Sequence, residues 1–496
     1  MKNKKSSTPD YIKTHFSDYF GVLPEILEKY GAFNVSLLSD LPLFIDPFLL
    51  FNSKKDEYRE LHSRIIIYLK FLRDKSAAGG LSRGLVQAWY RFPEVRQNWL
   101  GFSKTSNRGS GLGSDFARAL HENLHRVFTD FGSEQVTKGS HLEKLCLFSD
   151  GVGKDHVSDF TTNLIKEFLL DYTQAFAKEH VHPTLRRKVR VPGVRFNYIT
   201  ETWEVQTYDL PYFEGDYVLL TPKDMLTKDK TWINRSDLID EFEDIPNAIP
   251  NDELRAQINN YFDKQLPEKR TAKARREAVR KTIHEFPQLI DYFIRLKEDH
   301  GNDAADISAQ KVSQSQILYE RQLKQLLGLL NSTTNFYGLV GDTYDEAMKR
   351  VTFLKDVIEN KDGYRIFYVK GEPIQREADL QILFRLCWFG TPSDVNREVN
   401  NGRGPVDFKI SRGSADSTLV EFKLASNTHL KNNLLKQVEI YQKASDAKQG
   451  IKVILYFTME QRERVLRILE ELKMADDENI VLINARADDK ISASKA

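Results

Sequence analysis

Between residues 405 and 424, apolar and polar side chains alternate along two short segments that flank a turn-rich stretch. The first segment, residues 405–410, has the sequence PVDFKI, and the second, residues 418–424, has the sequence TLVEFKL. Because successive side chains of a strand point to opposite faces, this period of two predicts a β-hairpin with one apolar face. Phe408 and Phe422 then share the core face, and the charged residues between the apolar positions share the other.

Further strand and helix patterns surround the hairpin. Residues 451–457 (IKVILYF) and 480–484 (IVLIN) are short and mostly apolar, which is typical of buried strands. Residues 460–473, which lie between them, carry apolar side chains at helical spacing, as do residues 343–358 upstream. A strand–helix–strand order gives parallel neighbours in a sheet. We therefore predict an α/β domain at residues 341–490, built as a mixed sheet flanked by helices.

The chain before this domain is predicted to be a large, mainly helical region with a small β-rich insert. Apolar side chains recur at helical spacing in three segments, residues 57–72, 157–176 and 319–330. Residues 189–198 alternate like a strand. The expected organisation is a helical domain at residues 1–183, the insert with an acidic loop region at 184–263, and a helical linker domain at 264–340.

Composition and charge narrow the possible classes of function. The 496 residues are 41% hydrophobic and 29% charged, as in ordinary globular proteins, with a net charge of +1. Such a chain has no strong overall field, so any nucleic acid would have to bind at local basic patches. Two cysteines supply neither a disulfide framework nor a zinc cluster. Because neither a run of about 18 apolar residues nor a signal peptide is present, we expect a cytoplasmic protein that does not enter a membrane.

The charged face of the hairpin requires a compensating cation. If the hairpin is centred near Ser414, Asp407 lies directly across from Glu421. Opposed strand residues have Cβ atoms about 5 Å apart, and like charges there are destabilising. Hard divalent ions such as Mg²⁺ bind carboxylates, waters and phosphate oxygens. Lys423 lies on the same face, where it could hold a water or stabilise charge on a phosphate. These are the parts that metal-assisted phosphodiester hydrolysis needs.

This arrangement resembles the PD-(D/E)XK nuclease superfamily, which has the restriction-endonuclease-like fold. Asp407 followed by Glu421-Phe422-Lys423 matches its motif, although Pro405-Val406-Asp407 departs from a literal Pro-Asp. The resemblance covers residues 372–484.

Two further features of the superfamily have counterparts here. Gln437 and Tyr441 resemble the Gln-x-x-x-Tyr signature of the exonuclease-related branch. The acidic residue expected on a preceding helix corresponds best to Glu377, with Asp379 and Glu398 as alternatives.

The resemblance implies a role for each matched residue. Asp407, Glu421 and the carbonyl of Phe422 would hold one or two Mg²⁺ ions, for which Mn²⁺ can substitute. Lys423 would orient the attacking water, and Glu377 would support the metal shell. Gln437 would position the substrate or the Lys423 ammonium, and Tyr441 would pack behind Gln437.

Nucleic-acid contacts are expected at two places. Lys409 and Tyr441 lie within the expected nuclease domain, and Arg275 and Arg276 lie in a basic run at residues 269–281. That run could follow a DNA backbone, because phosphate contacts come from Lys and Arg. A solvated helix face is the alternative for the run, as a solvated strand face is for the hairpin.

The expected function is Mg²⁺-dependent hydrolysis of DNA by an endonuclease, and the chain is similar in kind to prokaryotic phage-defence nucleases. The N-terminal region would then sense DNA or a phage-derived trigger and restrain the nuclease, and a homo-oligomer is a further possible partner. Two alternatives stay open: a repair or recombination nuclease that uses the same site, and a catalytically inactive nucleic-acid-binding module.

Overall fold

The computed structural model describes most of the chain. The described residues are 13–101, 117, 121, 124, 131–148, 154–267, 271–339, 341–388, 394–400, 405–412, 416–435 and 449–490, of which 394–400, 405–407, 412 and 449 are described by backbone alone. The architecture is mixed α/β, with one mixed sheet and several smaller ones. No helix among these residues is both long and apolar enough to span a bilayer.

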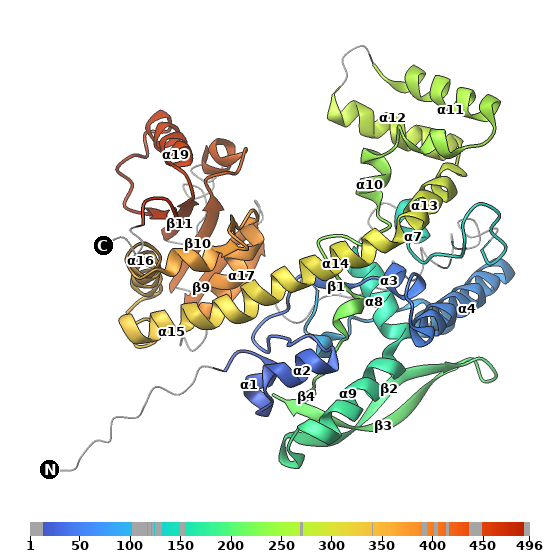
Figure 1. Ribbon diagram of the computed structural model, residues 1–496, viewed down its shortest axis with the longest axis horizontal. Coiled ribbons are helices and arrows are strands. Elements are labelled where there is room, and N and C mark those ends of the chain that lie inside the picture. The colour runs from blue at the N-terminus through green and yellow to red at the C-terminus, as the bar shows by residue number, and fades with distance from the viewer. Residues whose placement is uncertain are drawn as a thin grey trace.

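The C-terminal domain is built on a five-stranded mixed sheet with the order β12-β11-β10-β9-β8 (Figure 1). Its strands are β8 (Asp394–Asn400), β9 (Pro405–Arg412), β10 (Asp416–Leu424), β11 (Gln449–Tyr456) and β12 (Ile480–Asn484). The first three strands are antiparallel neighbours, whereas β10, β11 and β12 run parallel. The predicted hairpin and the predicted parallel part of the sheet are thus both confirmed.

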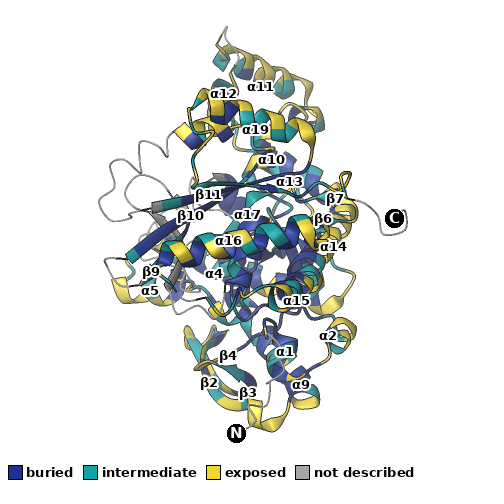
Figure 2. Ribbon diagram, turned by 90° about the vertical axis from the view of Figure 1, so that its left-hand side faces the viewer, coloured by how far each residue is buried: buried dark blue, intermediate teal, exposed yellow. Residues whose placement is uncertain are grey.

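Helices cover both faces of this sheet. On one face, Phe422 of β10 packs with Phe384 of α17 (Glu377–Cys387) and joins a core that includes Leu354 of α16 (Thr343–Asn360). On the other face, Ile454 of β11 packs in a separate core with residues of α19 (Met459–Glu471). Covering both faces explains why β10 is almost entirely buried, as Figure 2 shows in dark blue. The helices predicted at 343–358 and 460–473 are confirmed as α16 and α19.

The N-terminal region combines helices with two small sheets. Its elements are α1 (Phe16–Phe20), α2 (Pro24–Tyr30), β1 (Leu43–Ile45), α3 (Pro47–Phe51), α4 (Asp56–Ala78), α5 (Arg83–Tyr90), η1 (Arg96–Asn98), α7 (Lys144–Phe148), α8 (Lys154–Leu164), α9 (Lys166–His180), η2 (Pro183–Leu185), β2 (Arg186–Asn197), β3 (Thr202–Phe213), β4 (Asp216–Tyr217), η3 (Lys223–Met225) and β5 (Leu226–Lys228). The order β2-β3-β4 forms an antiparallel sheet, and β1 pairs with β5. The helical spacing of residues 157–176 is confirmed, and these residues belong to two helices, α8 and α9, separated at Ile165.

A helical arm projects from this region (Figure 1, green to yellow). It holds α10 (Arg235–Asp240), η4 (Ile245–Ala248), α11 (Asp252–Gln265), α12 (Ala272–Glu285) and α13 (Leu289–Asp299). These elements share one hydrophobic core, which also includes Phe48 and Leu49 of α3 and Leu147 of α7. In Figure 2, α11 and α12 are largely exposed.

A long helical segment joins the arm to the C-terminal domain. It consists of α14 (Gly301–Gln316), the π-helix η5 (Ile317–Gln322) and α15 (Leu323–Thr333), and spans roughly 50 Å at the usual helical rise. The segment crosses the N-terminal region on its way (Figure 1, yellow). The helix expected at 319–330 is therefore confirmed in its second half, whereas its start belongs to the π-helix.

Candidate active site

The hairpin has the register that its alternating pattern predicts. Val420 pairs with Phe408 and Leu419 pairs with Lys409, so the two strands are symmetric about position 414. The same register, continued by one residue, would place Asp407 opposite Glu421. The Asp407 side chain lies outside the described residues. Glu421 itself is 4% exposed, which is rare for a glutamate without a compensating partner.

Lys423 provides that partner and links Glu421 to a third predicted residue. Its Nζ lies 2.9 Å from Oε1 of Glu421 and 3.4 Å from Oε2 of Glu377. Glu377 is the first residue of α17, and its Oε1 accepts hydrogen bonds from the backbone N–H of Leu424 (3.3 Å) and from Nδ2 of Asn427 (2.7 Å). The side chains of Glu377, Glu421 and Lys423, predicted from the sequence, therefore converge at one end of β10.

A second lysine lies beside Glu421 on the neighbouring strand. Lys452 of β11 is the parallel register partner of Glu421, and it is only 5% exposed. Burial lowers the pKa of Lys452, and the Glu421 carboxylate opposes that shift. The apolar pattern of residues 451–457 predicts a buried strand but assigns no role to this lysine. Its signal was present, since a charged side chain interrupts an otherwise apolar run.

The chemistry of these side chains fits a hard divalent ion. Glu377 and Glu421 supply carboxylate oxygens, the donors that Mg²⁺ prefers. Lys423 bridges them in this structure, so an ion bound by Glu421 would share that carboxylate with the ammonium group. Over the described ranges, no group of three His, Cys, Asp or Glu side chains is arranged to hold a metal. The further protein ligands expected from the sequence are Asp407, whose side chain is not described, and the carbonyl of Phe422.

The other predicted residues divide between the described and undescribed parts. Gln437 and Tyr441 lie outside the described residues. The Phe422 side chain belongs to the core, with its ring centroid 4.2 Å from that of Phe384. Lys409 is half-buried on β9, where it pairs with Leu419 and with Asn396 of β8.

The two arginines expected to contact DNA lie on α12 of the arm. Arg275 forms an ion pair with Glu243 (Nε–Oε1, 3.1 Å) and donates to the carbonyls of Ile239 (2.8 Å) and Asp240 (3.3 Å). These contacts give Arg275 a role in holding the arm together. Arg276 is exposed on the same helix.

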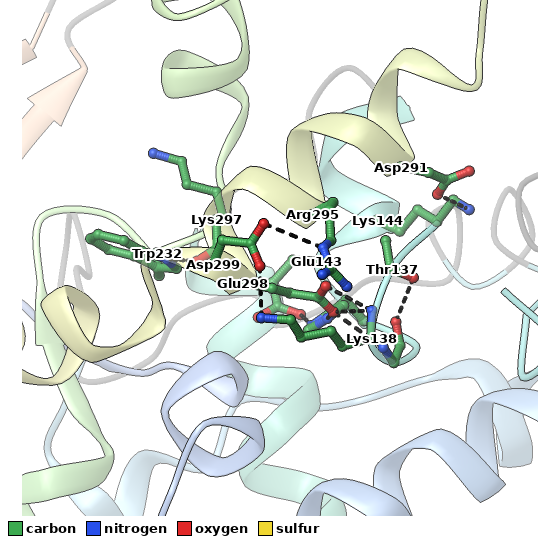
Figure 3. A network of polar contacts seen from close by, with 12 residues as sticks. Thr137, Lys138, Glu143, Lys144, Trp232, Asp291, Arg295, Lys297, Glu298 and Asp299 are labelled. Carbon is green, nitrogen blue, oxygen red and sulfur yellow. Dashed lines mark hydrogen bonds and ion pairs between the residues drawn. The ribbon is translucent and has the colours of Figure 1, made fainter. Parts of the chain in front are cut away.

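A second polar cluster ties the arm to the N-terminal region. Figure 3 shows Glu298 of α13 beside Lys138 and Glu143. The Glu298 carboxylate accepts from the backbone N–H groups of Lys138 (2.9 and 2.7 Å) and Gly139 (3.1 Å), and it lies 2.9 Å from Nε2 of His141. Because its oxygens already accept this set of hydrogen bonds, Glu298 has a structural role here.

Two segments of the chain are similar to known domain families. Residues 21–234 match a family described as a domain of unknown function (DUF8370), and residues 343–459 match another described in the same way (DUF8371). The second segment runs from α16 to the start of α19 and includes Glu377, Glu421 and Lys423. No curated protein and no solved structure matches the chain.

Proposed function

We propose that residues 341–490 form a Mg²⁺-dependent nuclease domain that hydrolyses phosphodiester bonds of DNA. The observation that carries this proposal is the convergence of Glu377, Glu421 and Lys423 beside a hairpin of a mixed sheet. The resemblance of the hairpin motif to PD-(D/E)XK nucleases supports the same assignment. A buried carboxylate (Glu421) and a half-buried one (Glu377) joined by one lysine are costly to build for stability alone, since burying charges costs several kcal/mol per ion.

In the proposed reaction, a water attacks the phosphorus, the P–O3′ bond breaks, and the 3′-oxygen leaves with a proton. The products are a 5′-phosphate and a 3′-hydroxyl. Glu421, with Asp407 and the Phe422 carbonyl, would hold the ion, and Glu377 would support its water shell. Bound Mg²⁺ supplies activation of water and neutralisation of phosphate charge. Lys423 orients the water through its ammonium group, and Gln437 and Tyr441 complete the site as the resemblance implies.

The test is a cleavage panel of plasmid, linear duplex, single-stranded DNA and RNA, with Mg²⁺, Mn²⁺ or EDTA. The unmodified protein should cut DNA with either metal and not with EDTA. Lys423→Ala should stay folded, because Lys452 remains beside Glu421, and cut at least about 100-fold more slowly, the scale expected when a positioned donor is lost. The matched control is Lys431→Ala, which removes an exposed lysine paired with Glu471 (2.6 Å) and should cut normally. Equal cleavage by Lys423→Ala and the parent would refute the assignment.

The biological role we propose is that of an effector in antiviral defence, restrained by the N-terminal region until DNA or a phage component is sensed. Expression of the active protein should then be toxic, and Asp407→Ala should remove the toxicity. A preference for branched or damaged DNA over phage genomes would instead favour the repair or recombination nuclease.

One observation favours a second candidate, a nucleic-acid-binding module without catalysis. Lys423 forms ion pairs with both Glu377 and Glu421, so the protein itself supplies a positive charge that compensates these carboxylates. Calorimetry that detects no binding of Mg²⁺ or Mn²⁺, together with DNA binding, would select this candidate.

A further inference from the structure

The first turn of α17 faces two parts of the molecule at once. Glu377 points to Lys423 and the end of β10, whereas Asp379, two residues later, contacts the N-terminal region. The Asp379 carboxylate lies 3.2 Å (Oδ1) and 3.4 Å (Oδ2) from Nζ of Lys228, the last residue of β5. One short helical turn thus joins the candidate active site to the segment that matches the first domain family.

Asp379 and Lys228 form a buried cluster with Tyr319. Tyr319 donates a hydrogen bond to Oδ1 of Asp379 at 2.5 Å, and Lys228 Nζ lies 5.5 Å from the centroid of the Tyr319 ring. The exposed fractions are 7% for Lys228, 6% for Asp379 and 0% for Tyr319. Removing one partner of a buried ion pair leaves an uncompensated charge, which is strongly destabilising. The three groups therefore depend on one another for their arrangement.

A second contact supports the same junction. Arg376, the residue before Glu377, forms an ion pair with Asp229, the residue after Lys228. Asp229 has a left-handed backbone conformation (φ 76°), and its carbonyl accepts a hydrogen bond from Nζ of Lys154 at 2.5 Å. The end of β5 therefore contacts α17 on both sides of Glu377.

The π-helix η5 supplies the third element of the junction. A π-helix is rare, and a short one within a longer helix is frequently found at functional sites. Here it carries Tyr319, which contacts Asp379, and Glu320, whose Oε1 accepts from Nδ2 of Asn34 at 2.7 Å. Through these two adjacent residues, the long helical segment contacts both α17 and the N-terminal region.

From this geometry we propose that the Lys228–Asp379–Tyr319 cluster couples the N-terminal region to the candidate active site. Asp379 is then a positioning residue: it fixes the first turn of α17 and thereby the Glu377 carboxylate. Movement of β5, as on binding of a trigger by residues 21–234, would displace Glu377 from Lys423 and from the Leu424 amide. The inference deepens the proposed nuclease function and rests on it for its consequence in catalysis.

Three variants test the coupling. Asp379→Asn and Lys228→Met each leave one charged partner of the buried pair, whereas the double variant removes both charges. Replacing both partners of a buried pair is often nearly neutral, so the double variant should recover what each single variant loses. Lys297→Met is the matched control, because Lys297 forms a buried pair with Asp237 (3.0 Å) in the arm, away from α17.

Two readouts distinguish positioning from general loss of stability. The first is the half-saturating Mn²⁺ concentration for DNA cleavage, which should rise at least about tenfold in each single variant, or about 1.4 kcal/mol, and return to within about threefold in the double variant. The second is hydrogen exchange of a peptide containing the Leu424 amide, which donates to Glu377. Its exchange should be faster in the single variants and not in Lys297→Met.

The outcomes separate this inference from the proposed function. If the parent protein does not cut DNA with metal, the nuclease proposal fails, and exchange at Leu424 alone decides the coupling. If the parent cuts DNA but the single variants match Lys297→Met in both readouts, the coupling is refuted while the nuclease proposal stands. Lack of recovery in the double variant would also overturn the coupling.

Discussion

Buried acidic residues have different surroundings in the N-terminal region and in the C-terminal domain. In the C-terminal domain, Glu421 has the Lys423 ammonium 2.9 Å away and Lys452 as its strand partner. In the N-terminal region, burial and the neighbouring Asp46 raise the pKa of Glu143 well above its usual range. A carboxyl kept neutral can serve as a structural hydrogen-bonding group, whereas a carboxylate compensated by lysines can exchange that partner for a metal ion.

Asp46 and Asp159 extend the pattern in the N-terminal region. Burial raises the pKa of Asp46 to about 6, even though the carboxylate accepts hydrogen bonds from the N–H groups of Trp232 and Phe48. Burial, Glu94 and Asp155 together raise the pKa of Asp159 to about 8. Buried acidic residues thus occur in both regions, and what sets Glu421 apart from these three is the Lys423 ammonium 2.9 Å away on the same strand. The candidate site is therefore distinguished by the lysine beside its buried carboxylate, more than by the burial of that carboxylate.

The largest expected effect is on catalysis. Glu377→Gln keeps an oxygen that can accept from Leu424 and Asn427, but it loses the ion pair with Lys423. DNA cleavage with Mg²⁺ should fall by about 100-fold or more, in the range for a lost catalytic group. Steady-state cleavage of a labelled duplex measures this, with Glu471→Gln as the exposed control. A loss of less than about threefold would exclude Glu377 from the site.

The next effect concerns stability and pH. The pKa of Asp159 is raised to about 8 from an ordinary 3.8. Between about pH 4 and pH 8 the folded protein therefore holds a proton that the unfolded chain has already released. This contribution to the free energy of unfolding is present at pH 4 and is lost as the pH rises to 8. Each tenfold change in proton affinity is worth about 1.4 kcal/mol, so a rise in pKa from 3.8 to about 8 amounts to about 6 kcal/mol at most.

Asp159→Asn removes this titration. The variant should match the parent in thermal unfolding at pH 4 and be more stable than the parent at pH 8. Parallel curves of unfolding temperature against pH for the two proteins would contradict the assignment of a neutral Asp159.

A smaller effect is expected at Lys452. Lys452→Met removes a positive charge beside Glu421, and a nearby cation repels a divalent ion. The half-saturating Mn²⁺ concentration should therefore fall, by about three- to tenfold, while the maximal cleavage rate declines modestly. Metal titrations of activity measure both quantities. A rise in the Mn²⁺ requirement would show that Lys452 acts through Glu421 in some other way.

The smallest effect separates the two arginines of the arm. Arg275→Ala loses an ion pair and two carbonyl contacts within the arm, so it should lower thermal stability by about 1 kcal/mol and leave DNA affinity unchanged. If the exposed face of α12 contacts DNA, Arg276→Ala should leave thermal stability unchanged and weaken DNA binding. This loss in affinity should shrink at high salt. Identical behaviour of the two variants in DNA-binding titrations would contradict this division.

The fold around the candidate site follows largely from local patterns. Alternation in residues 405–424 gives the hairpin and its register about position 414, and helical spacing gives α16 and α19. Glu377 was identified through the family resemblance, because the helix pattern alone does not distinguish it from Asp379. In the structure Asp379 binds Lys228 and Tyr319, and Glu377 faces Lys423.

What the sequence does not reveal depends on distant partners. Lys228 and Asp379 are 151 residues apart, so no local pattern encodes their pairing. The π-helix at Ile317–Gln322 interrupts a segment with ordinary helical spacing, and its distinguishing contacts are with Asp379 and Asn34. Lys452 was missed because a mostly apolar run predicts a strand without saying which neighbour its one charged side chain will meet.

The central claim is that Glu421, compensated by Lys423, can hold a divalent ion. Calorimetric titration of Mn²⁺ into the full-length protein, compared with Glu421→Gln, tests it without requiring a substrate. We predict saturable binding to the unmodified protein that is lost or weakened at least about tenfold in Glu421→Gln. Equal Mn²⁺ binding by the two proteins, or no binding by the unmodified protein, would contradict the claim.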